Sequence, residues 1–310
     1  MGKYIVTSGQ NIYDVALHLY GSIEGIVDLL MNNTELSFAT DLKSGDELIF
    51  TDGYIINADT VSYNRIHKIV PSNGERSVYY KEASWPLLME FILSKFETST
   101  DFTASGTGKV EIDWGDNSLL ETVTLSEEVR HINHSFDNLV SKHRKIRIYG
   151  EALFSQLDFT MLKANAIYLH KPVYVEKFIL TDTAIKIGFL SLLDGIYDLD
   201  LSGHNTDNLL ELLDCKKLMR LNLSYLDAAQ SVIDNYLISL VKYYYGRRSC
   251  TITLTARPSG EYNEPARDQK HNYILTTGME AVWLLSNEPA WNEGGFWKFI
   301  IDNETYSSEK

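Results

Sequence analysis

Two aspartates and two histidines near the middle of the chain come closest to a set of residues that could support chemistry. Asp113 and Asp116 flank a Trp-Gly pair, and His131 and His134 follow downstream. Paired carboxylates can act as general acid and base or can coordinate a hard cation such as calcium. An aspartate beside a glycine in a tight turn instead hydrogen-bonds its own backbone. The sequence therefore favours a structural turn, with calcium binding and catalysis as alternatives.

The other residues of chemical interest are scattered. His131 and His134 are three positions apart on an expected strand, so their side chains should point to opposite faces and are not expected to share a metal ion. Cys215 and Cys250 lack the spacing of a zinc site and are predicted to be reduced and buried. The chain contains no GxSxG, HExxH, P-loop or GxGxxG motif. These observations predict a protein that is not an enzyme and uses no cofactor or metal.

The composition sets limits on the class of protein. The chain has 310 residues and a formal net charge of −14, with 44% hydrophobic and 23% charged residues, which suggests two or three folded domains. Phosphate contacts require Lys and Arg, so a general nucleic-acid binder is not expected. No apolar run approaches the roughly 18 residues of a membrane span, and the first residues do not resemble a signal peptide. We therefore expect cytoplasmic synthesis without membrane insertion, or a cell-envelope location if an export signal has been lost.

The first 50 residues predict a compact β-α-α-β module. Alternation over residues 4–7 predicts a strand, and the apolar spacing that starts at Ile12 predicts a helix capped by Asn11. Gly21 suits the left-handed position that ends this helix, and residues 47–50 return as a strand. The second helix carries a predicted buried stripe of Ile23, Ile26, Val27 and Leu30.

This module resembles the lysin motif (LysM) family over residues 3–50, and the predicted domain spans residues 1–52. The matching positions are Tyr4, Val6, Gly9, Tyr20-Gly21, Leu29 to Asn32, Leu42 to Gly45 and Leu48-Ile49. Such modules bind peptidoglycan and other N-acetylglucosamine glycans, and they also occur as assembly pieces of phage tails and baseplates. The resemblance implies a glycan- or partner-binding groove formed by Ser8, Gly9, Gln10, Asn11, Ile12, Met31, Asn32 and Asn33. The same residue types favour turns and caps, so a purely structural role remains open.

Residues 53–85 form a predicted linker or accessory segment, and residues 86–150 a predicted all-β domain. In the latter the hydrophobic period becomes two, and the expected strands lie 8–15 residues apart, as in β-sandwiches. The IDWGDNS turn from residue 112, the HINHSF strand and the later KIRI strand resemble the polycystic-kidney-disease (PKD) type of immunoglobulin-like sandwich. Asn117 replaces the usual last glycine of the turn, and Phe136 replaces the usual tyrosine.

The second half repeats an L-x-L pair. Successive pairs begin at Leu157, Phe178, Leu199 and Leu221, at intervals of 21, 21 and 22 residues, and another begins at Ile252. Intervals in this range are typical of leucine-rich repeats, and the intervening segments have helical periodicity. Residues 151–256 therefore resemble a short, irregular leucine-rich-repeat solenoid of α/β type, with residues 257–310 as its C-terminal cap.

A solenoid of this family recognises partners through its exposed strand face, here Asp198, Asp200, Arg220 and Asn222. A charged strand face is as often simply solvated, and that alternative stays open.

Together the segments predict a multidomain α+β protein that resembles prophage tail and baseplate proteins of Bacteroidetes. We expect a non-enzymatic, virion-associated component that docks to protein partners and binds no nucleic acid. The alternative is a cell-envelope protein that binds peptidoglycan or another N-acetylglucosamine glycan through the LysM-like module.

Overall fold

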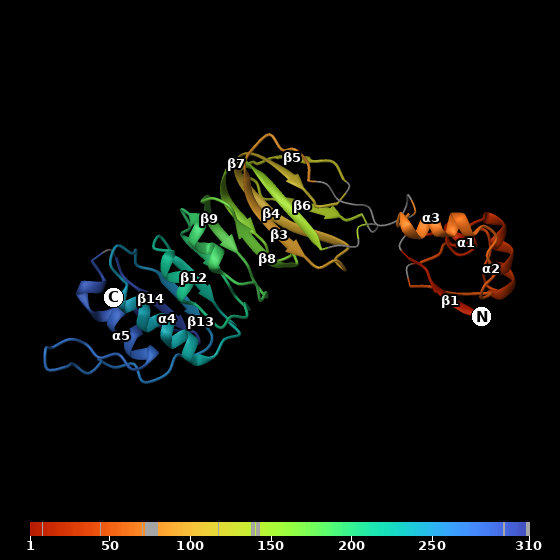
Figure 1. The fold of residues 1–310 in the computed structure, drawn as a ribbon. Coiled ribbons are helices and arrows are strands. Elements are labelled where there is room, and N and C mark those ends of the chain that lie inside the picture. Colours follow the sequence, from red (N-terminus) through yellow and green to blue (C-terminus); the bar gives the residue numbers. More distant parts are fainter. Residues whose placement is uncertain are drawn as a thin grey trace. The chain divides into compact units, whose positions relative to one another are not determined.

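The chain divides into two compact units, shown by the computed structural model in Figure 1. Unit 1 comprises residues 1–79 with 137–142, and unit 2 comprises residues 80–136 with 143–310. The mixture of helices with a large sheet is the α+β class that the sequence predicts. The structure describes residues 1–7, 9–43, 45–69, 71, 80–116, 118–137, 140, 143–293 and 295–307. Two residues named above, Ser8 and Asn117, lie outside the described residues.

Unit 1 has the β-α-α-β order that the sequence predicts. Its elements are β1 (Gly2–Ile5), α1 (Ile12–Tyr20), the short 3-10 helix η1 (Ile23–Gly25), α2 (Ile26–Asn32), β2 (Glu47–Phe50) and α3 (Ala58–Ile66). Strands β1 and β2 pair in antiparallel fashion. Helix α3 belongs to the same unit, because the Ile56 and Asn57 N–H groups both donate to the Tyr20 carbonyl at 2.9 Å. Part of the predicted linker 53–85 is therefore folded onto the first module.

The ends of α1 follow from two residues that the sequence singles out. The Asn11 side chain accepts the Asp14 N–H at 2.9 Å, and the Asp14 carboxylate accepts the Asn11 N–H at 2.9 Å, which completes a capping box. Gly21 ends the helix with φ of 72°. A Cβ atom there would lie 2.1 Å from the Asn57 carbonyl oxygen, so both the backbone conformation and the close contact require glycine.

The predicted buried stripe of the second helix is wrong at two positions. Ile26 and Leu29 lie in the core, but Ile23 and Val27 are exposed. The reason for Val27 lies within α2, where Ile26 and Leu29 are three positions apart and share the buried side, whereas Val27 directly follows Ile26 and lies further around the helix. Leu29, rather than Val27, therefore turns inward.

Unit 2 begins with antiparallel strands that curl around an aromatic core. They are β3 (Leu87–Leu93), β4 (Ser99–Asp113), β5 (Glu121–Thr124), β6 (Arg130–Ser135), β7 (Arg144–Asp158) and β8 (Ala164–Leu169). The long strands β4 and β7 pair with each other; β4 also pairs with β5 and β6, and β3 lies between β7 and β8. The ring of Phe159 packs edge-on against Phe91, Phe102 and Phe178, with centroids 5.0, 5.7 and 5.3 Å away.

Strand β7 continues into a parallel ladder that carries the predicted repeats. The further strands are β9 (Val173–Ile179), β10 (Leu193–Asp194), β11 (Asp198–Asp200), β12 (Arg220–Leu223), β13 (Thr251–Leu254), β14 (Lys298–Ile301) and the antiparallel β15 (Glu304–Ser307). The predicted alignment of the L-x-L pairs is confirmed, because their first residues stand opposite one another in register. These buried residues are Leu157, Phe178, Leu199, Leu221 and Ile252, and Phe299 extends the row.

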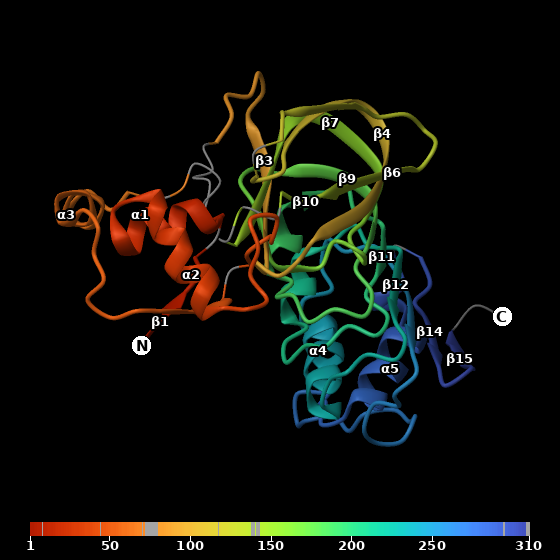
Figure 2. The same ribbon diagram turned by 90° about the vertical axis from the view of Figure 1, so that its right-hand side faces the viewer.

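Helices cover one side of this ladder (Figure 2). They are η2 (Gly188–Leu192), η3 (Leu210–Asp214), α4 (Gln230–Lys242), α5 (Gly278–Asn287) and η4 (Pro289–Trp291). Both cysteines are buried there, as predicted. The predicted domain boundary between residues 150 and 151 falls inside β7, whose first half pairs with β3 and whose second half pairs with β9. The antiparallel and parallel parts of unit 2 therefore share one sheet, which has 13 strands within the described residues.

A buried histidine in the ladder predicts a pH-dependent stability of unit 2. His204 is fully buried, its Nδ1 lies 2.8 Å from Thr183 Oγ1, and burial lowers its pKa. The unfolded chain protonates this residue near the ordinary pKa of about 6.5. Unfolding therefore takes up a proton, and the free energy of unfolding should fall as the pH drops below about 6.5.

Urea denaturation of the full chain at about pH 7.5, 6.5 and 5.5 measures this effect. We expect the His204→Gln variant to lose less stability over this interval than the unchanged protein. The same pH slope in both proteins would show that another group is responsible.

Candidate functional site

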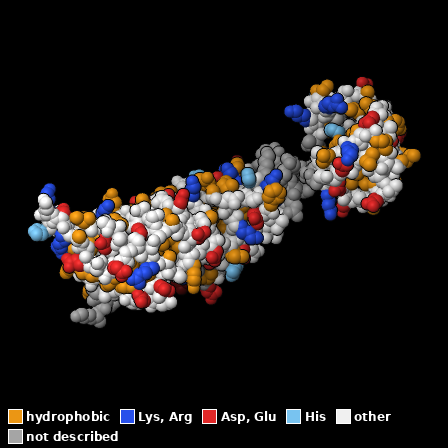
Figure 3. All heavy atoms as spheres, turned by 90° about the horizontal axis from the view of Figure 1, so that it is seen from below, with side chains coloured by type: hydrophobic (Ala, Val, Ile, Leu, Met, Phe, Trp, Pro, Cys, Tyr) orange, Lys and Arg blue, Asp and Glu red, His pale blue; other side chains and the backbone are white. Residues whose placement is uncertain are grey.

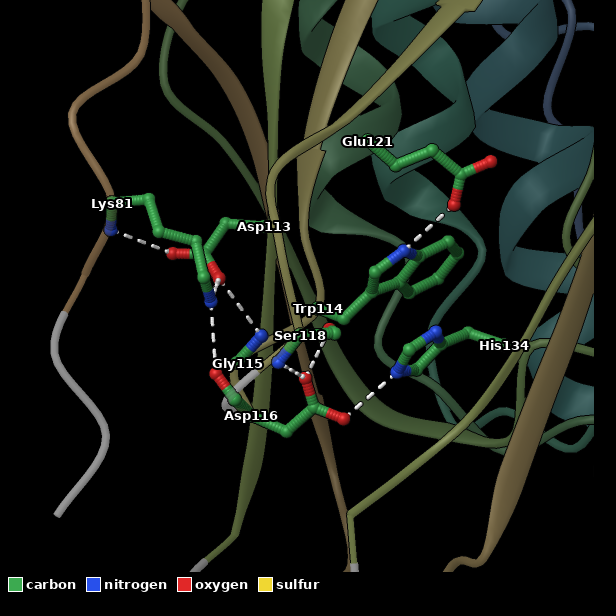
Figure 4. A network of polar contacts seen from close by, with 8 residues as sticks. All are labelled: Lys81, Asp113, Trp114, Gly115, Asp116, Ser118, Glu121 and His134. Carbon is green, nitrogen blue, oxygen red and sulfur yellow. Dashed lines mark hydrogen bonds and ion pairs between the residues drawn. The ribbon is translucent and has the colours of Figure 1, made fainter. Parts of the chain in front are cut away.

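The two aspartates singled out in the sequence lie together at the end of β4, where they form the polar cluster of Figure 4. The Asp113 carboxylate is buried and accepts three hydrogen bonds: from the Lys81 N–H at 3.1 Å, from Lys81 Nζ at 2.7 Å and from the Gly115 N–H at 3.1 Å. Lys81 Nζ also donates to the Asp116 carbonyl at 2.8 Å. Lys81 thus ties the segment before β3 to the turn after β4.

Asp116 is equally buried and joins the turn to β6. It accepts the Ser118 N–H at 2.9 Å and the Ser118 hydroxyl, and its Oδ2 lies 2.8 Å from His134 Nε2. The His134 ring stacks on Trp114, with centroids 4.6 Å apart and planes at 5°. Trp114 Nε1 in turn donates to Glu121 at 3.0 Å. Strands β4, β5 and β6 are linked through this cluster.

The cluster contains the residue types of a serine hydrolase but not their order. In such a triad the histidine lies between serine and aspartate, so that it can take the serine proton. Here Asp116 lies in the middle and contacts both Ser118 and His134. His134 contacts Asp116 and not Ser118 in these hydrogen bonds, so it is not placed to take the serine proton as in such a triad. The geometry therefore stabilises the turn, which is the interpretation that the sequence favours for both aspartates.

The two histidines face opposite sides of β6, as their spacing predicts. His134 is largely covered by Trp114, whereas His131 is exposed, with its Nδ1 3.4 Å from Asp101. Across the part of the chain that the structure describes, no three His, Cys, Asp or Glu side chains gather in a way that could hold a metal ion.

The first side of the predicted LysM-like groove is used mainly for internal contacts. Gln10 is buried; its side-chain oxygen accepts the Thr7 N–H at 2.8 Å, and its amide donates to the Tyr4 hydroxyl at 2.8 Å. Ile12 is buried in the core, and Asn11 caps α1. Gly9 occupies a turn with φ of 76°. The structure therefore gives these four residues folding roles.

The second side of the groove is partly open. The Asn33 side chain exchanges two hydrogen bonds with the Ile49 backbone, at 2.8 and 2.9 Å, and Asn32 donates to the Asp28 carbonyl at 2.9 Å. Both asparagines nevertheless line a mainly polar hollow of about 480 Å³ between α2 and β2. None of the predicted residues 9–12 lines this hollow. Met31 is exposed.

The structure does bring the four predicted strand-face residues together on adjacent strands. Asp198 lies opposite Arg220, with an ion pair of 3.5 Å, and Asp200 accepts a hydrogen bond from Asn222 at 3.0 Å. Asp200 and Asn222 also accept the Ser202 and Ser224 N–H groups, at 2.9 and 3.1 Å. These two residues therefore cap the turns that follow their strands, and Arg220 remains the exposed member of the set.

An exposed apolar stripe on unit 1 was not predicted from the sequence. Ile23, Val27 and Met31 are 54%, 62% and 76% exposed. Val27 and Met31 are four residues apart along one side of α2, and Ile23 lies in η1 just before it. The sequence pattern assigns Ile23 and Val27 to the apolar side of the second helix, whereas it places Met31 in the predicted groove. Figure 3 shows hydrophobic side chains over much of the surface of this unit.

Comparisons with protein-family models, with curated proteins and with solved structures found no match in any of the three. The structure itself defines a class: a mixed helix-and-sheet chain of two compact units, one of them built on a single large sheet. None of the helices within the described residues combines the length and the apolar composition needed to cross a bilayer.

Proposed function

We propose that the protein is a non-enzymatic docking component of an assembly of the phage tail or baseplate type, and that unit 1 attaches it to a protein partner. The observation that carries this proposal is the exposed stripe of Ile23, Val27 and Met31. Contiguous apolar surface on a small folded unit is a mark of protein interaction sites. Aliphatic side chains offer no hydrogen bonds, so they suit a protein surface better than a hydroxyl-rich sugar.

Other exposed side chains strengthen the case for a protein partner. Tyr13 and Leu17, four residues apart on α1, and Ile66 on α3 are also exposed. Of the residues that would bind a glycan by analogy with LysM modules, Gln10 and Ile12 are buried and Asn11 caps α1. Unit 1 thus exposes apolar side chains on α1, η1, α2 and α3.

Charge substitution in the stripe tests this function. In the full chain, the double substitution Val27→Asp and Met31→Asp should reduce co-purification with phage-like particles at least about ten-fold, because a charged residue buried in an apolar interface is strongly unfavourable. Sedimentation of particles from cells that produce the tagged protein, followed by immunoblotting, measures the bound fraction.

A matched control is Phe38→Asp, which alters an exposed apolar residue of unit 1 outside the stripe. It should leave co-purification unchanged, and circular dichroism should show both variants folded. Equal particle association of the double variant and the unchanged protein would overturn the proposed docking surface.

Peptidoglycan binding is the second candidate, and the polar hollow lined by Asn32 and Asn33 favours it. Retention of the full chain on insoluble peptidoglycan, reduced by Asn32→Ala and unaffected by Val27→Asp, would support this alternative. Absence of retention by the folded protein would leave the docking function.

A further inference from the structure

A hollow of about 500 Å³ lies where α4 ends in unit 2. One wall is the end of η3, with Asp214, and the segment that follows it, with Lys216. The other wall is the end of α4 and the turn that follows it. This second wall includes Lys242, Tyr243 and Tyr245. The volume falls in the range of about 300–1,000 Å³ that is typical of ligand sites.

Arg247 holds the two walls together. Its guanidinium donates to the Cys215 carbonyl at 3.3 Å and to the Leu213 carbonyl on one wall, and its Nε donates to the Tyr243 carbonyl at 3.4 Å on the other. Burial raises the pKa of the Cys215 thiol to about 11, and the positive charge of Arg247 opposes this rise. Arg247 therefore connects the two walls and places a positive charge between them.

The hollow is positively charged on a chain that is acidic overall. Lys216, Lys242 and Arg247 face a single carboxylate, that of Asp214. In the described part of the chain neither lysine has a carboxylate within 4.0 Å, so their charges are available to a ligand. Three cations against one anion contrast with the formal net charge of −14 of the whole protein. An anionic group should therefore be attracted to this place.

Two tyrosine side chains line the hollow, and both are exposed rather than packed in the hydrophobic core. Tyr243 and Tyr245 are 63% and 86% exposed. Tyr245 lies at the corner of a tight turn in which the Tyr244 carbonyl accepts the Arg247 N–H at 3.1 Å and Gly246 has φ of 71°. Exposed aromatic rings beside cations can stack on a ligand ring while the cations bind its charge.

Two further hollows lie close to the first one. Asp214 and Lys216 also line a second hollow of about 360 Å³, which includes Lys217 and Pro172. Pro172 in turn lines a third hollow of about 520 Å³ beside Tyr174. The second hollow also contains Asp194, which pairs with Lys217 at 2.6 Å, so among the described residues only the first hollow combines the two unpaired lysines, Lys216 and Lys242.

We propose that this hollow binds an acidic polysaccharide, with a sugar ring against Tyr243 and Tyr245 and its acidic group at Lys216 and Lys242. The formal net charge of −14 of the whole chain disfavours a general nucleic-acid binder, which needs many Lys and Arg contacts to phosphates. A peptide made only of Asp and Glu lacks a ring that could stack on the two tyrosines.

Affinity electrophoresis of the full chain tests the proposal. The probes are polygalacturonate, hyaluronate and a glycerol-phosphate teichoic acid, with neutral dextran, single-stranded DNA and polyglutamate as comparisons. We expect retardation by at least one acidic glycan, weakened by salt, and no retardation by dextran. Tyr245→Ser and the double substitution Lys216→Gln and Lys242→Gln should each weaken binding about ten-fold.

Matched controls lie on exposed parts of the same unit. Tyr225→Ser removes another highly exposed tyrosine, and Lys186→Gln another exposed lysine; both should bind as the unchanged protein does. The proposal is overturned if none of the three acidic glycans binds, if the hollow variants bind as well as the controls, or if DNA or polyglutamate binds more tightly. Such a failure would not affect the docking function proposed for unit 1, whose test uses different residues.

Discussion

Replacement of Asp113 by alanine should lower the free energy of unfolding of unit 2 by about 3 kcal/mol. The substitution removes the acceptor of three hydrogen bonds, which come from the Lys81 N–H, the Lys81 ammonium and the Gly115 N–H. The ammonium keeps its hydrogen bond to the Asp116 carbonyl, but it loses its ion pair. Breaking a buried ion pair by removing one partner costs about 3–5 kcal/mol. We expect the lower end of this energy range because the Lys81 side chain is 21% exposed and keeps part of its hydration.

Chemical denaturation of the full chain, followed by tryptophan fluorescence, measures this change. Asp101→Ala is the matched control, because its exposed carboxylate faces only the exposed His131; we expect a loss of at most about 0.5 kcal/mol. The double variant Lys81→Met and Asp113→Leu should recover only the part of the loss that comes from the unpaired ammonium, because the backbone N–H groups of residues 81 and 115 still lack the Asp113 carboxylate. An Asp113→Ala variant as stable as Asp101→Ala would contradict the structural role of the pair.

The second large effect is expected in the parallel ladder, where Leu221→Ala should destabilise unit 2 by about 3 kcal/mol. Leu221 is buried in the row that runs from Leu157 to Phe299, and its neighbours in that row are Leu199 and Ile252. Truncation leaves a cavity that close-packed neighbours fill only partly, which adds to the lost transfer free energy.

The adjacent residue is the best control for this substitution. Arg220 lies on the same strand but points to the opposite, exposed face, so Arg220→Ala should change the free energy of unfolding by about 0.5 kcal/mol or less. Denaturation midpoints of the two variants provide the comparison. Similar losses for both would show that β12 is not oriented as described.

The local structure could be predicted well where one short stretch of sequence determines it. The capping box at Asn11 and the left-handed Gly21 depend on neighbouring residues alone, and both are present. The register of the L-x-L pairs could also be predicted, because a near-constant interval fixes which residues meet in a parallel ladder. Phe299 was missed as a member of the row because a long insertion precedes it.

The candidate sites were harder to predict because accessibility depends on distant residues. Gln10 has the polar character expected of a groove residue, yet Tyr4 and Thr7 take up its hydrogen bonds. Lys81 is 32 residues from Asp113 in sequence, and no local pattern indicated that the two would pair. The cations at the end of α4 come from segments that only the folded chain brings together. Sequence patterns thus identified the helices and strands, whereas the accessible side chains of the candidate sites could be identified only from the tertiary structure.

The continuity of β7 limits how the chain can be divided by experiment. A fragment that starts at residue 151 would keep the second half of β7 but lose β4, its hydrogen-bonding neighbour on that side. The row of N–H and C=O groups left open would be an unprotected sheet edge, which readily recruits strands from other molecules. We expect such a fragment to aggregate, whereas a fragment that retains the whole of residues 80–310 keeps that edge covered.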